Sequence, residues 1–346
     1  MTSSNSTKCA PGVIVVLAIL AGCSSGSQPA FAPSSRTIGP AVSALPPAYL
    51  NPRRPFHGIL GSASGSGDLY VSAFLGGTIL GYKSNKKGRA DKKNGPPICT
   101  ISGVSLPNDI AGDAKGNLID PDGGTHNVIV FGPKCGASKG TISDPYGTPA
   151  DAASVDALTG TIAVATIVQN NQNTGSVTLC TLKSGCMANL TSSSIIGGVA
   201  AVALNKAGDC WAVSENASTA ALTYFQGCGG SGQAATGFEN ASYGGLDIDR
   251  SGNIVSIDFK NSRLYVYKGC NPACTIVGGP FTLHGESIYG HLDKAGKTYA
   301  TVEHAAGQVD IYSYKPKGLT YLYSFSNGLN DSLDYEGVAY APSATK

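Results

Sequence analysis

Residues 245–258 read GLDIDRSGNIVSID, and they show the pattern from which the fold can be predicted. Apolar side chains alternate with polar or small ones on both sides of a short turn, as in a β-hairpin. Gly252 permits the tight reversal of the chain at that turn. No window of the sequence has a convincing 3.6-residue periodicity, so the pattern predicts an all-β protein.

The same pattern returns along the chain at a nearly constant interval. Successive turn glycines are 49, 44, 48, 44 and 44 residues apart. Each copy has room for about four short strands, which is typical of a β-propeller blade. The repeat therefore predicts a six-bladed β-propeller of four-stranded blades. The turn glycines are Gly67, Gly116, Gly160, Gly208, Gly252 and Gly296.

One strand, at residues 336–342, is left over after the sixth copy. If it pairs with the first copy, one blade is assembled from both chain ends and no sheet edge stays exposed. We expect this closure. A solenoid built from the same repeats is the structural alternative that the sequence leaves open.

Two segments resemble a known group of propellers. The unit G-x-x-x-D-x-x-G-N-[LI]-x-x-x-D at 245–258 resembles NHL-repeat propellers and the related gluconolactonase-like group. The segment LPNDIAGDAKGNLID at 106–120 is similar to the Pro-Asn-Asp stretch of the gluconolactonase-like hydrolases. The resemblance implies a propeller, a fold that binders, scaffolds and enzymes share.

The start of the chain predicts export. Lys8 precedes an apolar stretch from Val13 to Gly22, which is too short to span a bilayer and fits a secretory signal. Leu20-Ala21-Gly22-Cys23 resembles the lipobox of bacterial lipoproteins, which implies cleavage after a signal peptide of residues 1–22 and a diacylated Cys23. An ordinary signal peptide with an incidental cysteine is the alternative. Since Ser24 rather than Asp follows the cysteine, the resemblance favours the outer membrane.

Residues 23–55 are rich in Ser, Pro, Gly and Ala. Such a segment cannot bury enough apolar surface to fold, so it predicts a disordered tether between the lipid and the propeller at 56–346.

Cysteine usage indicates an oxidising compartment, because ten cysteines accompany only two methionines and one tryptophan. With Cys9 in the signal peptide and Cys23 lipidated, eight remain for disulfides. The repeat favours Cys210–Cys228 across a hairpin, Cys180–Cys186 and Cys270–Cys274 in short outer loops, and Cys99–Cys135 between neighbouring blades. A zinc site at Cys270 and Cys274 competes, although no further ligand pair follows at zinc spacing.

Charge is scarce and locally segregated. Only 13% of residues are charged and the net charge is +2, which argues against a nucleic-acid binder. Six Lys and Arg residues gather within 83–93. This run is either a contact for anionic lipid or cell-wall polymer, or a solvated loop.

Polar side chains gather at the loops of one predicted propeller face, where calcium finds oxygen ligands. They equally fit strand caps and Asx-turns. Loops leading to the innermost strands supply His57, Asn108, Asp109, Asp151, Tyr243, Glu286 and Glu336. Loops from second to third strands supply Asp120, Asp122, His126, Glu215, Asn216, Asp258, Asn261, Glu303 and His304.

The gluconolactonase-like group holds a divalent cation with a Glu, two Asn and an Asp. The resemblance implies Glu336 and Asn108 as ligands. The polar loop positions add Asp109 and Asp258 as further metal candidates, and their oxygen ligands indicate calcium as the ion. The later Pro-Asn-Gly element of that group has no counterpart, since the matching place reads SYGGLDID.

The densest acid–base cluster in the sequence contains three histidines and two glutamates. A His within reach of a Glu is a candidate general base, which makes His284, Glu286 and His304 the catalytic candidates. Loop histidines that merely hydrogen-bond are the alternative. The cluster comprises His284, Glu286, His291, Glu303 and His304.

Two functions follow from these observations. The leading one is an extracytoplasmic, lipid-anchored, monomeric propeller that binds a ligand, an envelope protein or a carbohydrate without turnover. The alternative is a divalent-metal-dependent hydrolase or lyase acting on lactones or sugar derivatives. A purely structural spacer in an envelope assembly also remains open.

Overall fold

The computed structural model describes residues 68–84, 96–156, 159–169, 174–216, 219–304, 306–330 and 334–341. The predicted signal peptide, Cys23, the tether, His57, Gly67 and most of the basic run at 83–93 lie outside the described residues. Among the described residues, no helix has the length and apolar character needed to cross a membrane.

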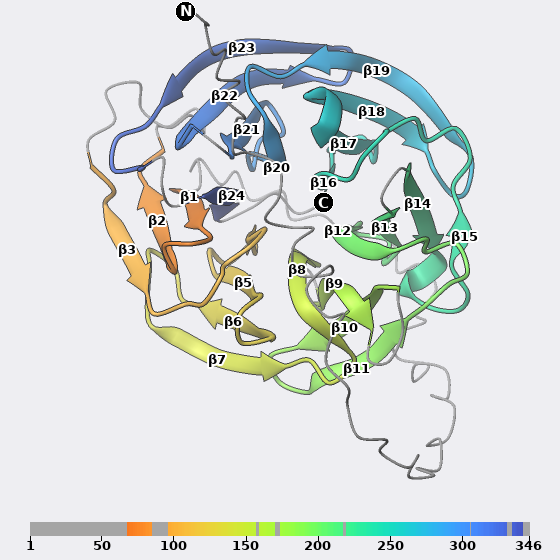
Figure 1. The fold of residues 1–346 in the computed structure, drawn as a ribbon, viewed down its shortest axis with the longest axis horizontal. Coiled ribbons are helices and arrows are strands. Elements are labelled where there is room, and N and C mark those ends of the chain that lie inside the picture. Colours follow the sequence, from red (N-terminus) through yellow and green to blue (C-terminus); the bar gives the residue numbers. More distant parts are fainter. Residues whose placement is uncertain are drawn as a thin grey trace, which may run out of the picture. The chain divides into compact units, whose positions relative to one another are not determined.

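Six antiparallel sheets of four strands each form a closed ring, which confirms the predicted six-bladed β-propeller (Figure 1). In every blade the strands follow one another from the axis outward. The six innermost strands contact one another in turn around the ring.

The blades have the following strands, given from the axis outward. Blade one contains β24 (Tyr335–Ala341), β1 (Asp68–Ala73), β2 (Thr78–Tyr82) and β3 (Cys99–Ser102). Blade two contains β4 (Ala111–Gly112), β5 (Leu118–Asp122), β6 (Asn127–Phe131) and β7 (Ser138–Ser143). Blade three contains β8 (Gly147–Val155), β9 (Ile162–Gln169), β10 (Ser176–Thr181) and β11 (Gly185–Leu190).

Blade four contains β12 (Gly198–Leu204), β13 (Cys210–Asn216), β14 (Thr219–Phe225) and β15 (Gln233–Ala234). Blade five contains β16 (Leu246–Ile248), β17 (Ile254–Asp258), β18 (Arg263–Gly269) and β19 (Cys274–Thr282). Blade six contains β20 (Ser287–Leu292), β21 (Thr298–Glu303), β22 (Gln308–Lys315) and β23 (Gly318–Phe325). Two 3-10 turns, Gln226–Cys228 and Phe259–Asn261, complete the regular elements of the described chain.

The predicted closure of the ring is confirmed. Strand β24, from the C-terminal part of the chain, pairs antiparallel with β1 and becomes the innermost strand of blade one. Backbone N–H and C=O groups along β1 therefore have partners on both sides, which removes an exposed sheet edge.

The repeated Asp-x-x-Gly-Asn sequence forms the turn from the innermost to the second strand. Asp249 Oδ1 accepts hydrogen bonds from the backbone N–H of Ser251 (2.8 Å) and Asn253 (2.9 Å). Gly252, at a φ of 79°, occupies the left-handed region that favours glycine. Asp113 and Asn205 make the same pair of bonds in blades two and four. The motif thus encodes an Asx-turn, which explains why Asp, Gly and Asn stand at fixed positions within it.

Apolar side chains fill the space between neighbouring blades. Val255 and Leu264 of blade five pack in one cluster with Tyr299 and Tyr312 of blade six, and all four are buried. Farther along the ring, Trp211 of blade four donates its Nε1–H to the carbonyl oxygen of Cys270 at 2.7 Å. The core therefore consists of contacts between neighbouring blades. These contacts hold the strands, and so the ends of the loops, in place.

Antiparallel blades give the propeller two distinct faces. Turns from first to second strand and from third to fourth strand lie on one face, which we call the turn face. Connections from second to third strand and from one blade to the next lie on the opposite face, which we call the loop face.

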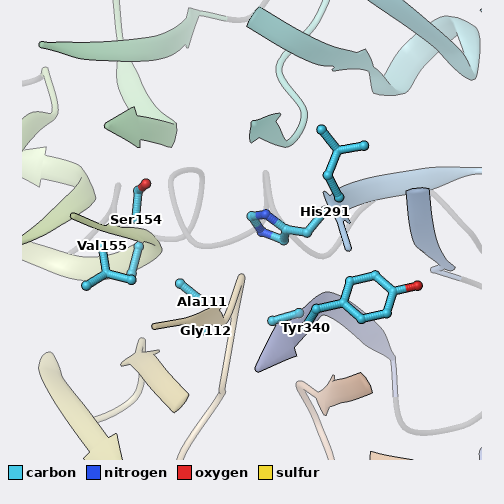
Figure 2. Close-up of a pocket in the computed structure, with 9 residues that line it drawn as sticks. Ala111, Gly112, Ser154, Val155, His291 and Tyr340 are labelled. Atoms are coloured by element: carbon cyan, nitrogen blue, oxygen red, sulfur yellow. The ribbon is translucent and has the colours of Figure 1, made fainter. Parts of the chain in front are cut away.

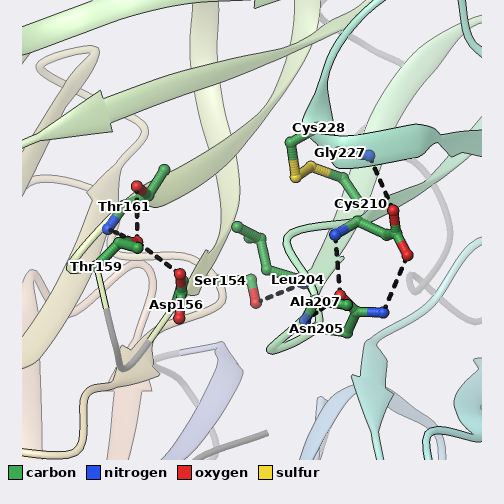
Figure 3. The surroundings of a disulfide bond; sticks show 11 residues. Ser154, Asp156, Thr159, Thr161, Leu204, Asn205, Ala207, Cys210, Gly227 and Cys228 are labelled. Atoms are coloured by element: carbon green, nitrogen blue, oxygen red, sulfur yellow. Dashed lines mark hydrogen bonds between the residues drawn. A yellow bond between two sulfur atoms is a disulfide. The ribbon is translucent and has the colours of Figure 1, made fainter. Parts of the chain in front are cut away.

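Four disulfides join the eight cysteines in the pairs that the sequence favoured: Cys99–Cys135, Cys180–Cys186, Cys210–Cys228 and Cys270–Cys274. By strand order, all eight cysteines lie at the turn face. Figure 3 shows Cys210–Cys228 beside the Asx-turn of Asn205. The disulfides indicate an oxidising, extracytoplasmic environment.

Candidate functional site

The axis of the propeller is crossed by Tyr289, from β20 of blade six. Its hydroxyl donates to Asp151 Oδ2 at 2.9 Å and lies 3.1 Å from the carbonyl oxygen of Ala200. Asp151 belongs to β8 of blade three and Ala200 to β12 of blade four, on the far side of the ring. Tyr289 is only 1% exposed, and its side chain spans the channel between these strands.

His291 lies two residues farther along the same strand and also projects inward. Its Nε2 lies 3.1 Å from Asp109 Oδ1, and its Nδ1 lies 3.6 Å from Asp247 Oδ2. The imidazole therefore links blade six to blades two and five. Asp247 Oδ2 also accepts a hydrogen bond from the backbone N–H of Leu292 at 2.7 Å, which holds this carboxylate beside the innermost strand of blade six.

A small pocket remains at the axis, toward the turn face. Figure 2 shows His291 pointing into the space between the ends of several innermost strands. The pocket is lined by Ala111, Gly112, Ala153, Ser154, Val155, His291, Leu292, Ala339 and Tyr340. Among the lining residues only His291, Ser154 and Tyr340 have polar side chains, so the pocket has few groups that could bind or activate a substrate.

Four neighbouring carboxyl groups, those of Asp109, Asp151, Asp334 and Glu336, lie in or just before the innermost strands, toward the loop face. Burial, together with the nearby charges of Asp151, Asp334 and Asp109, raises the pKa of Glu336 to about 8. Burial also raises the pKa of Asp151 to about 7, against the lowering effect of the hydrogen bond from Tyr289. Near neutral pH this group of acids therefore holds protons that ordinary carboxyl groups lose.

Two of the predicted metal candidates, Asn108 and Glu336, lie close to one another. A Cβ at Gly337 would stand 2.3 Å from the carbonyl oxygen of Asn108 and 2.9 Å from the Cα of Asp109. Only glycine permits this close approach, which brings Glu336 beside the 108–109 segment. The side-chain amide of Asn108, however, donates to the carbonyl oxygen of Ala150 at 3.1 Å. This hydrogen bond joins the segment before β4 to β8 of the neighbouring blade.

Asp258, another metal candidate, holds its own loop together. Oδ1 accepts the hydroxyl of Ser242 at 2.9 Å, and Oδ2 accepts the amide of Asn261 at 2.8 Å. The backbone N–H of Ala241 also donates to Oδ2 at 3.2 Å. With 1% exposure and these three donors, Asp258 acts as a loop cap.

The acid–base cluster of the sequence separates in space. His284 Nδ1 lies 3.6 Å from Asp310 Oδ2, and Glu303 joins this pair. His304 Nε2 instead lies 3.4 Å from Asp334 Oδ1. His291 points into the channel as described above. Glu286, an exposed residue, contributes its backbone carbonyl to the N–H of His304 at 2.9 Å.

Sequence reasoning missed Asp310, Asp247 and Tyr289. All three lie inside strands rather than in loops. In a strand, an alternating pattern does not distinguish them from ordinary polar or aromatic positions. Asp310 and Asp247 are both fully buried, and a buried Asp in the middle of a strand is the one signal that could have singled them out.

Comparisons with known proteins support the fold alone. No family model matches the chain, and no curated protein matches it. A chain in the crystal structure of a Nidogen/Laminin complex is similar with a TM-score of 0.63 at 12% identity, covering 80% of this chain and 98% of that one. A functionally unknown protein from Desulfotomaculum acetoxidans DSM 771 is similar with a TM-score of 0.52 at 12% identity, covering 78% and 84%. The chain is therefore a six-bladed β-propeller.

Proposed function

We propose that this protein is a lipid-anchored, extracytoplasmic β-propeller, related to NHL-repeat and gluconolactonase-like propellers, that binds a protein or carbohydrate partner through its loop face without turning it over. The observation that carries the proposal is the closed channel. Tyr289 reaches Asp151 and Ala200 across the axis, so the centre of the ring is occupied by the protein's own side chains.

The chemical difference between the two faces supports binding through the loop face. All four disulfides strengthen the turn face, whereas the loop face presents carboxyl groups, amides and imidazoles that vary from blade to blade. Recognition residues commonly sit on loops held by a rigid scaffold. A similar propeller occurs in a Nidogen/Laminin complex, which is an assembly between proteins.

The alternative of a metal-dependent hydrolase or lyase receives less support. Its axial ligand set requires the amide of Asn108 and the carboxylate of Asp258, and both are engaged in structural hydrogen bonds. The small axial pocket also has few polar side chains with which to hold a lactone.

The anchor is tested on the full chain by mass spectrometry of the N-terminal peptide. We expect diacylglycerol on Cys23, and Cys23→Ser should abolish both the lipid and membrane fractionation. An unmodified Cys23 in membrane-associated protein would overturn the anchor without affecting the binding proposal.

The binding face is tested in cells with a photo-crosslinking amino acid at exposed positions. We expect adducts of a defined partner from His126 and Glu286 on the loop face, and none from Lys115 or Lys206 on the turn face. The two control positions are also exposed, so accessibility alone does not explain a difference. Equal crosslinking from both faces would contradict the proposal.

A further inference from the structure

Three potential metal ligands meet at the loop face of blade six, away from the axis. His284 lies in the connection before β20, Glu303 ends β21, and Asp310 lies near the start of β22. One ligand atom from each residue lies within 4.8 Å of the other two. Among the described residues, this is the one set of three or more His, Cys, Asp or Glu side chains that meets this distance limit.

Neighbouring side chains hold these three groups in place. Ser324 Oγ donates to Asp310 Oδ1 at 2.7 Å, and Gln308 Nε2 donates to Glu303 Oε2 at 2.6 Å. The imidazole of His284 stacks on the ring of Tyr321, with centroids 4.5 Å apart and planes 16° apart. Hydrogen bonds and packing of this kind orient the ligands at metal sites.

A buried hydroxyl independently indicates a missing partner at this place. Ser287 is fully buried, and its Oγ has no hydrogen-bond partner among the described residues. Ser287 pairs directly with Glu303 between β20 and β21, so both side chains project from the same face of the sheet. A buried hydroxyl without a partner costs free energy, and a water bound to a metal ion would supply one.

The backbone also passes unusually close to the acidic pair. A Cβ at Gly285 would stand 2.2 Å from Glu303 Cδ, so glycine lets the loop carry His284 over the carboxylate. Glu303 and Asp310 each have a carboxylate oxygen within 4.8 Å of the other's. A divalent cation would relieve this repulsion between two neighbouring carboxylates.

We propose that His284, Glu303 and Asp310 form a binding site for a zinc-class divalent transition metal ion. Ligands about 2.0–2.2 Å from a tetrahedral zinc ion lie about 3.4 Å apart. The separation of 3.6 Å between His284 Nδ1 and Asp310 Oδ2 fits that geometry. An imidazole ligand favours zinc over calcium, which takes six to eight oxygen ligands.

Three protein ligands leave at least one coordination position open. The side chain of His284 is 51% exposed, so the open side of the site faces solvent at the loop face. The ion would therefore carry an exchangeable water, which a carboxylate or imidazole of a binding partner could replace. This inference concerns metal binding and stands whether or not the proposed partner binding is correct.

The test is calorimetric titration of the full chain with Zn²⁺ after chelator treatment, with metal content checked by elemental analysis. We expect one equivalent of Zn²⁺ and a rise in melting temperature, since binding to the native state stabilises it. His284→Ala and Glu303→Gln should each weaken binding at least tenfold. Neither residue is fully buried, so both variants are expected to fold.

His126→Ala is the matched control, because His126 is an exposed loop-face histidine outside the cluster. It should bind Zn²⁺ like the unaltered chain. The proposal is overturned if the unaltered chain takes up no Zn²⁺, if it prefers Ca²⁺, or if His284→Ala and His126→Ala bind equally well.

Discussion

On the turn face, the carboxylates of Asp113 and Asp249 accept the same backbone N–H groups in different blades, and disulfides lie beside such turns. On the loop face, burial is the main cause that raises the pKa of Asp151 to about 7 and the pKa of Glu336 to about 8. The turn face repeats the same stabilising Asx-turn in several blades. The loop face has a different set of side chains in each blade, so it is where this propeller can differ from others in what it binds.

The comparison predicts that substitutions on the turn face reduce stability most, whereas those on the loop face change protonation and binding. Four experiments test this difference between the two faces.

The largest effect is expected from removing the disulfide between blades one and two. Cys99 and Cys135 are 36 residues apart, so Cys99→Ala with Cys135→Ala should lower the free energy of unfolding by about 4 kcal/mol. Urea denaturation under oxidising conditions measures this. Removing Cys180–Cys186, which spans only 6 residues, should cost about 2 kcal/mol. The difference is expected because a disulfide that closes a longer loop restricts the unfolded chain more. A larger loss for the short loop would contradict this explanation.

The next effect concerns the repeated turn. Asp249 is buried and accepts hydrogen bonds from Ser251, Asn253 and the hydroxyl of Tyr314, so Asp249→Ala should cost about 3 kcal/mol. The equivalent Asp113→Ala, in a more exposed turn, should cost about half as much. Urea denaturation of both variants checks the order, and a cost below about 1 kcal/mol for Asp249→Ala would remove the special role of the turn.

The third effect is a pH dependence that belongs to the loop face. The native pKa of Glu336, about 8, exceeds its ordinary value of 4.5, so the folded state binds this proton more tightly. The resulting stabilisation is complete below pH 4.5 and is lost as the pH rises toward 8. Glu336→Gln should therefore reduce the loss of stability between pH 5 and pH 8, by about 3 kcal/mol.

Urea denaturation at a series of pH values measures this loss. Asp151, whose pKa is about 7, should preserve part of the slope in the variant. Glu286→Gln, an exposed control, should leave the whole slope unchanged. An identical slope in Glu336→Gln and the unaltered chain would show that Glu336 ionises normally.

The smallest effect is expected at exposed loop-face positions. Glu286→Gln should change the free energy of unfolding by less than about 0.5 kcal/mol, because its side chain is exposed. If the loop face binds a partner, the same variant should reduce the crosslinking yield measured at His126. A large loss of stability with unchanged crosslinking would reverse the assignment of the two faces.

Much of the fold could be predicted because the propeller repeats its local signals. The spacing of turn glycines such as Gly116 and Gly252 gave the number of blades, and both glycines have the positive φ that the turn requires. The left-over strand gave the closure of the ring, observed at Tyr335–Ala341. Placing cysteines on the repeat gave all four pairs, because a blade fixes which strand ends are neighbours.

The candidate sites could be predicted only in part. Loop polarity identified Asn108, Asp109 and Glu336 as neighbours of the axis, but it could not show that Asn108 turns its amide toward Ala150. His284 and His291 are seven residues apart, yet one lies at the rim of blade six and the other in the channel. Strand direction and pleat, rather than distance along the chain, decide where such side chains go.

The blade number, the strand order, the turn chemistry and the disulfide pairing could all be predicted from the sequence, since each depends on local periodicity and chain connectivity. Which polar groups meet depends instead on how distant parts of the chain pack together. Tyr289 and Asp151 are 138 residues apart and touch across the axis. Asp310 joins His284 only because β22 lies beside the connection that precedes β20. The first contact arises from closing the ring and the second from the packing of strands within blade six, and no local pattern of residues encodes either.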